Sequence, residues 1–333
     1  MGVNNSDVNN LDVNSSDINK IEFNVSDYKV PTPGSWPGNN LLEDKAGWLW
    51  FTEMLGNKIG AVNIHNKEFR EYELSTPSSM PVGLAVEEDG TLWAALFRGN
   101  SLAKINPDSG EVIEYPLAEE SALPSSLVLD GKNRLWMTQL GANQISLFNP
   151  ETASFKGYPL PRQDSNPMQA IYDAQRDALW ISCANDERSY LAKLDLGTMA
   201  YDVFLTPTPT AQPIGLMLHK GNVWVAQGGA GSIAKFTPDS GQWKEFKLPG
   251  DKSQPVKLAL DNQERIWVSD GGGMGDVGGN QVAVFDQNTE QFDVVEMPVR
   301  GAKPMGITFA QDGNIWFTQQ GANRISQIDI EGI

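Results

Sequence analysis

Seven tryptophans stand at nearly equal intervals along this chain and constrain its fold more than any other feature. Each lies about a dozen residues after a proline that begins a short apolar segment, as in Pro81-Val-Gly-Leu and Pro213-Ile-Gly-Leu. The successive spacings are 43, 43, 44, 44, 43 and 49 residues, between Trp50, Trp93, Trp136, Trp180, Trp224, Trp267 and Trp316. Seven copies of one unit predict a repeat architecture, in which each unit buries its apolar face against its neighbours.

Each unit contains the pattern of four short strands. In the second unit we expect strands at residues 83–86, 91–95, 101–105 and 112–117. The turns between them, such as Glu87-Glu-Asp-Gly90 and Asn106–Gly110, are rich in residues that tolerate a positive φ or fix a negative one. Short strands of alternating polarity, with almost no helical periodicity, are typical of all-β folds. We therefore expect a seven-bladed β-propeller of four-stranded blades, with the tryptophans packed between neighbouring blades.

The repeat region begins with the last strand of a unit and ends before the last strand of its final unit, an arrangement that we call the offset. The segment from Ile21 to Pro33 resembles the last strand of a unit, such as Phe69 to Pro77, whereas the final unit ends near Ile330 without such a strand. We expect the N-terminal strand to complete the last blade, because this pairing closes the ring and removes two open sheet edges. The offset favours a closed propeller over an open solenoid.

The offset also divides the chain into two parts. Residues 1–19 are a polar, low-complexity segment with too few apolar residues to pack, which predicts a disordered tail. Residues 20–333 are expected to form one propeller domain.

Charge and composition exclude several classes of partner. The chain has 42 acidic and 25 basic residues and a net charge of -17, which argues against nucleic acid or an anionic membrane. It contains no apolar run of the length that spans a bilayer. The N-terminus lacks the apolar core of a secretion signal. Cys183 is the one cysteine, so no intrachain disulfide is possible and a reducing compartment fits best. We expect a cytoplasmic protein.

The repeated unit resembles that of a known family. Leu49-Trp-Phe-Thr-Glu53, followed by Gly56-Asn-Lys-Ile-Gly60 and Glu71-Tyr-Glu-Leu74, is similar to the repeat of the streptogramin B lyase (virginiamycin B lyase) family. The resemblance covers the chain from about residue 20 to its end. It implies a seven-bladed propeller with a small-molecule site at the top of the central channel. It also implies the family reaction, in which a cyclic depsipeptide is opened at its ester by elimination, with a magnesium ion and histidines at the site.

The histidines of that reaction have no counterpart at the matching positions. In the family they directly follow the proline that begins a blade, and here these positions hold Gly38, Val82, Ser125, Met168, Ile214, Val256 and Met305. The two histidines of this chain, His65 and His219, stand beside turns that we expect on the opposite face. A mechanism with a histidine base would lack its base. We therefore expect the fold to carry over without the mechanism, and no metal or other cofactor.

The residues of the blade-start loops suggest a small-molecule pocket. These loops should share one face with the loops that follow each tryptophan strand. An apolar ring around the channel mouth is expected from Val82, Met168, Ile214, Val256 and Met305. A second ring would come from the third residue after each tryptophan, which is Glu53, Leu96, Gln139, Cys183, Gln227, Asp270 or Gln319. An apolar bowl edged by a few polar groups is typical of small-molecule sites. The alternative is that these residues only plug the channel.

Two carboxylates are the candidate catalytic residues. Glu53 and Asp270 should have raised pKa values beside an apolar ring, as an acid or base requires. Alternatively, each accepts hydrogen bonds from loop amides. The amides of Gln139, Gln227 and Gln319 are further candidate substrate contacts, which could polarise a carbonyl or simply bond to the next loop. Cys183 is another candidate contact, but it lacks the histidine partner that would make it a nucleophile. The remaining candidate contacts are Trp36, Met80 and Arg98.

The sixth unit carries an insertion, Gly271–Gly279, which explains the spacing of 49 residues. It contains six glycines in nine residues. We interpret it as a flexible flap over the channel mouth, with Met274 and Asp276 as candidate substrate contacts. A plain connecting loop is the alternative.

Three functions remain open at this point. The first is an enzyme that converts a largely apolar, natural-product-like molecule without a metal, by ring-opening elimination or by intramolecular cyclisation or isomerisation. The second is a non-catalytic propeller that binds a protein or peptide on its top face. The third is a metal-dependent lactonase, which would need several carboxylates near the axis, where only Glu53 and Asp270 are in phase.

Overall fold

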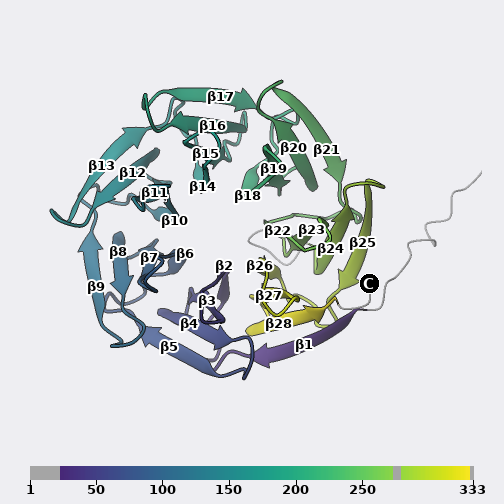
Figure 1. The fold of residues 1–333 in the computed structure, drawn as a ribbon, viewed down its shortest axis with the longest axis horizontal. Helices are drawn as coiled ribbons and strands as arrows, with labels where there is room; N and C mark the ends of the chain where they lie inside the picture. The colour runs from purple at the N-terminus through teal and green to yellow at the C-terminus, as the bar shows by residue number, and fades with distance from the viewer. Residues whose placement is uncertain (1–22, 273–278, 331–333) are drawn as a thin grey trace, which may run out of the picture.

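The chain folds into a closed ring of seven blades around a central axis (Figure 1). The computed structural model describes residues 23–272 and 279–330. The predicted tail at 1–19 and the contacts Met274 and Asp276 lie outside these residues. The described part forms seven four-stranded antiparallel sheets, which confirms the predicted propeller. It contains no helix that could cross a membrane.

The first three blades each use four consecutive strands, and the first strand of each lies nearest the axis (Figure 1). Blade 1 comprises β2 (Pro37–Glu43), β3 (Trp48–Glu53), β4 (Lys58–Asn63) and β5 (Phe69–Glu73); blade 2 comprises β6 (Pro81–Val86), β7 (Leu92–Leu96), β8 (Ser101–Ile105) and β9 (Val112–Pro116); blade 3 comprises β10 (Pro124–Leu129), β11 (Leu135–Gln139), β12 (Gln144–Asn149) and β13 (Ser154–Pro159).

The next three blades repeat this order. Blade 4 comprises β14 (Pro167–Asp173), β15 (Ala178–Cys183), β16 (Tyr190–Asp195) and β17 (Tyr201–Leu205); blade 5 comprises β18 (Pro213–His219), β19 (Asn222–Gln227), β20 (Ser232–Thr237) and β21 (Gln242–Lys247); blade 6 comprises β22 (Lys257–Leu260), β23 (Ile266–Asp270), β24 (Gln281–Asp286) and β25 (Gln291–Glu296).

Blade 7 joins the two ends of the chain. It comprises β26 (Pro304–Phe309), β27 (Ile315–Gln319) and β28 (Arg324–Asp329), and its outer strand is β1 (Asn24–Lys29). The antiparallel register runs from Asn24 opposite Asp329 to Lys29 opposite Arg324. Asp27 accepts hydrogen bonds from Gln319 Nε2 at 2.8 Å and Ser326 Oγ at 2.7 Å. The predicted ring closure is confirmed.

The predicted strands of the second unit agree with β6 to β9 within two residues at each end. The largest difference is at the start of β6, which begins at Pro81 instead of Gly83. Pro81 pairs with Leu96, and the register then shifts at a bulge before Gly83. The bulge interrupts the alternation of side chains between the two faces of the strand. The alternating sequence pattern therefore predicted a start at Gly83 and missed the two residues before the bulge.

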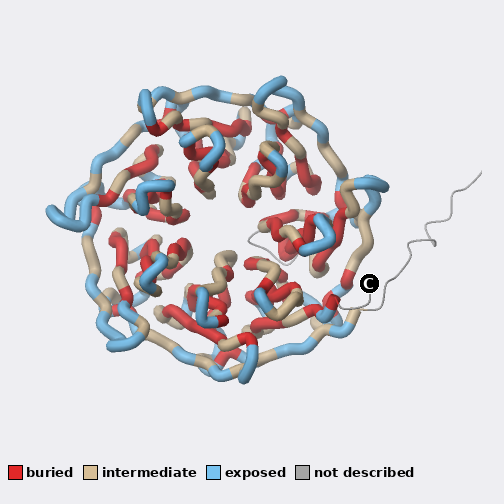
Figure 2. Tube along the Cα trace, viewed as in Figure 1, coloured by how far each residue is buried: buried red, intermediate tan, exposed pale blue. Residues whose placement is uncertain are grey.

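The tryptophans pack at the seams between blades, as predicted. Trp50 of blade 1 belongs to a buried cluster with Leu84, Leu92 and Ala94 of blade 2. Trp316 of blade 7 packs in the same way with Leu49 of blade 1, so the seam across the chain ends resembles the others. Figure 2 shows the buried residues concentrated in the inner strands of the blades and the exposed ones in the turns and along the outermost strands.

Six of the seven indole N–H groups donate to an acidic residue in the turn between the first and second strands. The bonds are 2.6 to 3.2 Å long, to Asp44, Glu87, Asp130, Asp173, Asp261 and Asp312. In blade 5 that turn follows His219 and has no acid, and Trp224 Nε1 has no partner among the described residues. In the other six blades the acid therefore fixes the orientation of the indole while its ring fills the seam.

In blades 1, 2, 3, 6 and 7 an asparagine in the turn after the second strand ties this turn to the next blade start. Asn57 has a φ of 56°, and its Oδ1 accepts hydrogen bonds from Ser79 N at 2.7 Å and Ser79 Oγ at 2.8 Å. Its Nδ2 donates to Leu74 O at 3.1 Å. Asparagine suits this position because it tolerates left-handed backbone. Asn100, Asn143 and Asn323 make equivalent bonds.

Candidate functional site

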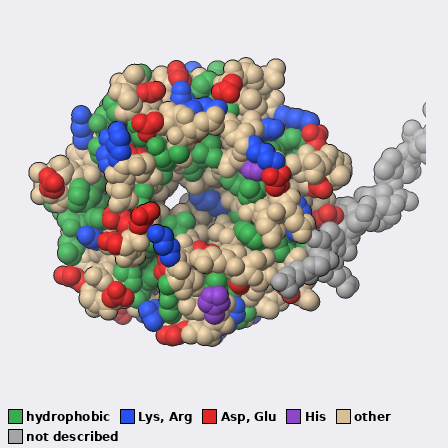
Figure 3. All heavy atoms as spheres, viewed as in Figure 1, with side chains coloured by type: hydrophobic (Ala, Val, Ile, Leu, Met, Phe, Trp, Pro, Cys, Tyr) green, Lys and Arg blue, Asp and Glu red, His purple; other side chains and the backbone are tan. Residues whose placement is uncertain are grey.

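The two ends of the ring have different chemistry. One end carries the blade starts and the turns between second and third strands, and we call it the blade-start face. The opposite face carries the turns between first and second strands and between third and fourth strands. His65 follows β4 and His219 ends β18, so both histidines lie on the opposite face, as expected. Figure 3 views that face, with the histidines in purple and an opening at the centre of the ring.

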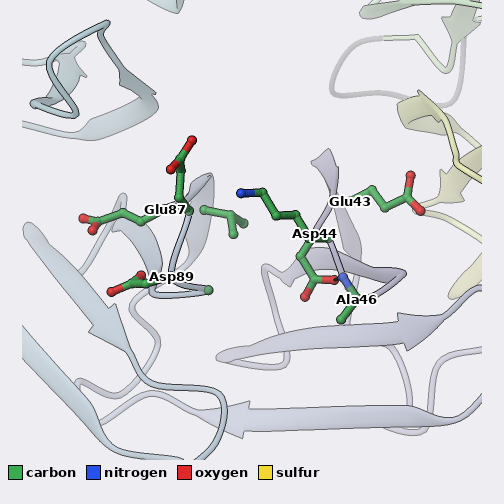
Figure 4. A pocket seen from close by; sticks show the side chains of 9 residues that line it. Glu43, Asp44, Ala46, Glu87 and Asp89 are labelled. Atoms are coloured by element: carbon green, nitrogen blue, oxygen red, sulfur yellow. Dashed lines mark hydrogen bonds between the residues drawn. The ribbon is translucent and has the colours of Figure 1, made fainter.

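Two acidic hollows lie between neighbouring turns on the opposite face. One of about 370 Å³ lies between blades 1 and 2, lined by residues 43–46 and 86–90 (Figure 4). The other, of about 570 Å³, lies between blades 2 and 3. Two of the acids already have partners, because Asp44 and Glu87 accept indole N–H groups. Glu43 points away towards blade 7, where it accepts Gln311 N at 2.9 Å. Within the described ranges, no three His, Cys, Asp or Glu side chains are placed to hold a metal ion.

The predicted apolar ring stands on the first strands at the blade-start face. Val82, Met168, Ile214 and Met305 keep part of their surface exposed, whereas Val256 is buried. In blade 1 the equivalent segment presents two amides, and Asn40 Nδ2 donates to Val82 O at 2.6 Å. The channel wall on this side is therefore mainly apolar, with a few amides.

Around this ring runs a rim whose two halves differ in polarity. In six blades the residue before the blade-start proline accepts a backbone hydrogen bond from the fourth residue after the tryptophan. In blades 1 to 3 all of these side chains are apolar, in the pairs Trp36 with Met54, Met80 with Phe97, and Leu123 with Leu140. In blades 4, 5 and 7 they are small or polar, in the pairs Asn166 with Ala184, Gln212 with Gly228, and Lys303 with Gln320.

Trp36 and Met80 were predicted contacts, and the structure places both on the apolar half of this rim. Trp36 is 39% exposed, and the neighbouring Leu55 is 56% exposed. Sequence reasoning missed Met54, Phe97, Leu123 and Leu140. The available signal was that apolar residues occupy these two repeat positions in the first three units and nowhere else together.

The second predicted ring is buried within the blades. All seven of its side chains are at most 1% exposed. Gln139 Nε2 donates to Ser146 Oγ at 3.0 Å, and Gln227 Oε1 accepts from Ser232 Oγ at 2.9 Å, so these amides bond to the third strand of their own blade. Gln319 Nε2 donates to Ser326 Oγ at 2.6 Å. These positions end the second strand, where the blade-start loops cover them. Their contact with a substrate stays a prediction.

Glu53 is a buried carboxylate with unusual surroundings. Neither of its carboxylate oxygens has a hydrogen-bond partner among the described residues. Burial, together with the nearby Glu71 carboxylate, raises the pKa of Glu53 to about 7. Gly56 and Gly60 leave it room, because a Cβ at Gly60 would lie 2.9 Å from Glu53 Oε1. Its ionisation properties fit an acid or base, but its side chain is fully covered.

Asp270, at the same repeat position, fastens the start of blade 6. Its Oδ1 accepts Gln254 N at 2.6 Å, and its Oδ2 accepts Gln281 Nε2 at 2.8 Å. Burial raises its pKa, and these hydrogen bonds oppose the shift. Gln254 lacks the positive φ of the residue before proline in the other six blades. Asp270 therefore has the hydrogen-bonding role that the sequence left as its alternative, and an acid–base role stays a prediction.

The two remaining candidates differ in accessibility. Cys183 is buried, and burial raises the pKa of its thiol to about 12. A thiol with such a pKa is not ionised at neutral pH, which agrees with the view that it is no nucleophile. Arg98 is exposed in the turn after β7, on the blade-start face.

Sequence reasoning missed one ionisable group on the first strands. Lys257 is the second residue after a blade-start proline, where other blades have glycine, serine, glutamine or asparagine. Its Nζ donates to Gln169 Oε1 of blade 4 at 2.7 Å. Burial of the amine lowers the pKa of Lys257 to about 7. The available signal was that Lys257 is the only charged residue at this repeat position.

Comparisons with known proteins agree with this architecture. The virginiamycin B lyase family profile matches residues 11–194, more than half of the chain. The virginiamycin B lyase from Staphylococcus aureus aligns with a TM-score of 0.83 at 21% identity, over 93% of this chain and 100% of that one. A streptogramin B lyase structure gives 0.83 at 23% identity, over 92% and 97%.

A third solved structure is a catalytically inactive variant of the Staphylococcus aureus lyase with quinupristin. It aligns with a TM-score of 0.83 at 20% identity, over 93% of this chain and 100% of that one. A comparison with curated protein sequences found no significant match. At these identities the structural likeness shows the fold. The family profile matches more than half of the residues of this chain, and this match shows that the chain belongs to the virginiamycin B lyase family.

Proposed function

We propose that this chain is an enzyme that converts a largely apolar, natural-product-like small molecule at the blade-start face without a metal. The reaction is a ring-opening elimination or an intramolecular cyclisation or isomerisation. The observation that carries the proposal is the rim, which is apolar over blades 1 to 3 and polar over the rest, above a mainly apolar channel wall. Membership of a lyase family supports the same class of reaction.

The rim would orient a ligand that has one apolar side. Burial of apolar surface contributes about 25 cal/mol per Å², so the apolar side would settle over Trp36, Phe97 and Leu123. Polar groups of the ligand would then face Gln212 and Lys303. A ligand held in one reactive conformer reacts as if its groups were at high effective concentration. Asn40 and Gln169, with amides near the channel wall, could polarise a carbonyl.

The first test uses quinupristin and, separately, a metabolite extract from the source organism. Each is incubated with active and with boiled protein and followed by mass spectrometry. A product of unchanged mass and new retention time supports the proposal, and fragmentation separates elimination from cyclisation. A gain of one water would reject it in favour of hydrolysis. No change in any peak across adequate coverage would favour a binding protein.

Variants then locate the site. Phe97→Gln should lower kcat/KM at least about ten-fold by removing apolar surface from the rim. Glu88→Gln on the opposite face is the matched control and should leave turnover unchanged. Glu53→Gln and Asp270→Asn test the predicted acid–base pair. Turnover retained by both variants would exclude acid–base chemistry by these carboxylates.

A second candidate function is a scaffold that binds a protein or peptide. The observation that favours it is the exposure of Trp36 and Leu55 on the blade-start face, since exposed apolar side chains grouped together mark interaction surfaces. The net charge of -17 supports the further proposal that neither nucleic acid nor an anionic membrane is a partner. The single cysteine, Cys183, supports the proposal that the protein is cytoplasmic, because a reducing compartment fits it best.

A further inference from the structure

Lys257 occupies a position that has a different task in neighbouring blades. In blades 3 and 4 the equivalent side chain accepts a backbone N–H from the next blade. Ser126 Oγ accepts Ala170 N at 3.3 Å, and Gln169 Oε1 accepts Leu216 N at 2.9 Å. A lysine side chain only donates hydrogen bonds and cannot do this. Its amine instead reaches past blade 5 to Gln169 Oε1.

The backbone of Lys257 is held firmly at this point. Its N–H donates to Ser269 Oγ at 3.1 Å, and Ser269 Oγ donates to Met305 O of blade 7 at 2.5 Å. On the other side, a Cβ on Gly215 of blade 5 would lie 3.0 Å from Lys257 Cα, so only glycine permits this approach. The amine is thus presented from a fixed backbone, and its one described partner is the neutral Gln169.

No acidic group compensates the charge of this lysine within the described ranges. No Asp or Glu there forms an ion pair with Lys257, and loss of solvation is the only cause of its lowered pKa. The charged and titratable residues on the first strands of blades 4 and 5, Tyr172, Asp173 and His219, end those strands towards the opposite face. On the paired strand β23, Asp270 accepts hydrogen bonds from Gln254 N and Gln281 Nε2. The first strand of blade 7, β26, has no charged residue. Lys257 nevertheless keeps part of its surface exposed. At neutral pH a large share of it is a free amine.

We propose that Lys257 is a nucleophilic amine that forms an imine with an aldehyde or ketone entering the channel. An anionic ligand is disfavoured, because a protein with a net charge of -17 repels anions, whereas a neutral carbonyl compound is not repelled. Desolvated lysine amines are the usual nucleophiles of imine-forming enzymes. The inference rests on the proposed function for the channel as ligand site and names carbonyl compounds as its substrate class.

The step balances without an external oxidant or reductant. The Nζ lone pair attacks the carbonyl carbon, a C–N bond forms, and one amine proton passes to the carbonyl oxygen, which gives a carbinolamine. The second amine proton passes to its hydroxyl group, the C–O bond breaks, and one water leaves, which gives the imine; the imine then takes up a proton from solvent. Gln169 Oε1 accepts one N–H during attack and leaves the lone pair free. The protonated imine draws electrons from the neighbouring carbon, which activates the ligand for elimination or cyclisation.

Reductive trapping tests the proposal without knowledge of the natural substrate. The full chain is treated with propionaldehyde and cyanoborohydride at pH 7, and each lysine is followed by peptide mass mapping. Lys257 should gain a propyl group at least about ten times faster than the exposed Lys220 and Lys244, because an ordinary lysine with a pKa near 10.4 is almost fully protonated at pH 7. If Lys257 is labelled no faster than these two lysines, the proposal is overturned. This holds even if the cause is that the probe cannot reach the amine.

The pH profile and two variants complete the test. The labelling rate of Lys257 should rise through pH 7 and level off near pH 8. The labelling rate of the exposed lysines should continue to increase above pH 8. Gln169→Leu, checked for folding by circular dichroism, should keep the adduct, since Gln169 only orients the amine. With a substrate in hand, Lys257→Arg keeps a hydrogen-bond donor but cannot form an imine, so it should abolish turnover.

The outcomes separate this inference from the proposed function. Trapping at Lys257 without turnover of quinupristin or of any extract component would keep the imine and reject the proposed enzyme. Turnover that survives in Lys257→Arg would keep the enzyme and reject the imine.

Discussion

Glu53 and Asp270 occupy the same repeat position, yet their neighbours give them different properties. Asp270 accepts two hydrogen bonds that offset part of its burial. Glu53 has none within the described structure, and its pKa rises to about 7. A buried carboxyl without donors is more stable protonated. Position in the repeat therefore sets where these side chains lie, while the adjacent residues set how they ionise.

This difference predicts a pH-dependent effect of Glu53→Gln. Between the unfolded pKa near 4.3 and the folded value of about 7, the folded state binds more protons, so wild-type stability falls as pH rises through this window. At pH 8 the penalty is on the order of 3 kcal/mol. The variant should be more stable than wild type at pH 8 and similar to it at pH 4. Urea unfolding at both values measures this, with the exposed Glu88→Gln as control. An equal difference at both pH values would contradict the account.

Asp130 should show the opposite dependence. Burial disfavours its charge, but hydrogen bonds from the Trp136 indole and from the backbone of Arg134 and Lys132 outweigh burial and hold the pKa of Asp130 below its usual value. Ionised Asp130 therefore stabilises the folded state fully above its unfolded pKa near 3.9. This contribution is lost as the pH falls through the pKa of Asp130 in the folded state.

The corresponding variant is Asp130→Asn. It should lower the free energy of unfolding by about 1–3 kcal/mol at pH 7, because a buried indole N–H loses a charged acceptor. The difference should shrink on acidification below about pH 3.9. Urea unfolding at pH 7 and pH 3 provides the comparison, and Asp108→Asn, at an exposed turn residue, is the control. A difference that stays constant on acidification would show that charge at Asp130 is unimportant.

At the scale of the element, the turn between second and third strands works as a connector between blades. Asn57 combines a left-handed backbone with three hydrogen bonds, two of them to Ser79. The Gly-Asn motif thus positions the next blade start, and with it the channel ring and the rim. The proposed site depends on these turns in two ways, because they carry rim residues such as Phe97 and because their hydrogen bonds hold the next blade start.

Two substitutions separate the contributions of Asn57. Asn57→Gly keeps the backbone conformation and should lose about 2 kcal/mol from the missing hydrogen bonds. Asn57→Ala should lose about 1 kcal/mol more, because alanine is strained at a positive φ. Denaturant unfolding measures both, with the exposed turn residue Asn288→Ala as control. Equal losses in the two variants would show that backbone strain is irrelevant there.

At the scale of the whole molecule, stability depends on the pairing of β1 with β28. Without β1, blade 7 would have three strands and an open edge, and Asp27 and Tyr28 would be lost. Asp27 bonds to Gln319 and Ser326, and Tyr28 stacks on Trp316 with ring centroids 5.5 Å apart. Open edges promote aggregation. The ring is therefore completed by residues almost 300 positions apart.

Strand complementation tests this closure. A chain starting at residue 31 should unfold at lower urea concentration and scatter more light than the full chain. A peptide of residues 23–30 added in trans should restore both properties, because it supplies the missing edge strand. The same peptide with Asp27→Ala and Tyr28→Ala is the control and should not. Equal stability with and without residues 1–30 would refute the role of β1.

Sequence alone settled the features that repeat. The tryptophan spacing, the turn residues and the offset ends predicted seven blades, the packing of tryptophan at the seams and the closing strand. It also located the starts of the blades, because all seven share a proline. These features depend on short-range patterns that recur in every unit, so each copy supports the reading of the others.

Tertiary structure decided what happens between blades. The second ring was expected at the channel edge, yet the blade-start loops cover it. The rim pairs of blades 1 to 3 form one apolar half only when these blades are placed side by side. Lys257 donates a hydrogen bond to Gln169, which lies 88 residues earlier in the sequence. The pKa of Lys257 is lowered because neighbouring strands bury its amine. A pattern within one unit does not contain these effects, because solvation and hydrogen bonding depend on which atoms of other blades surround a group.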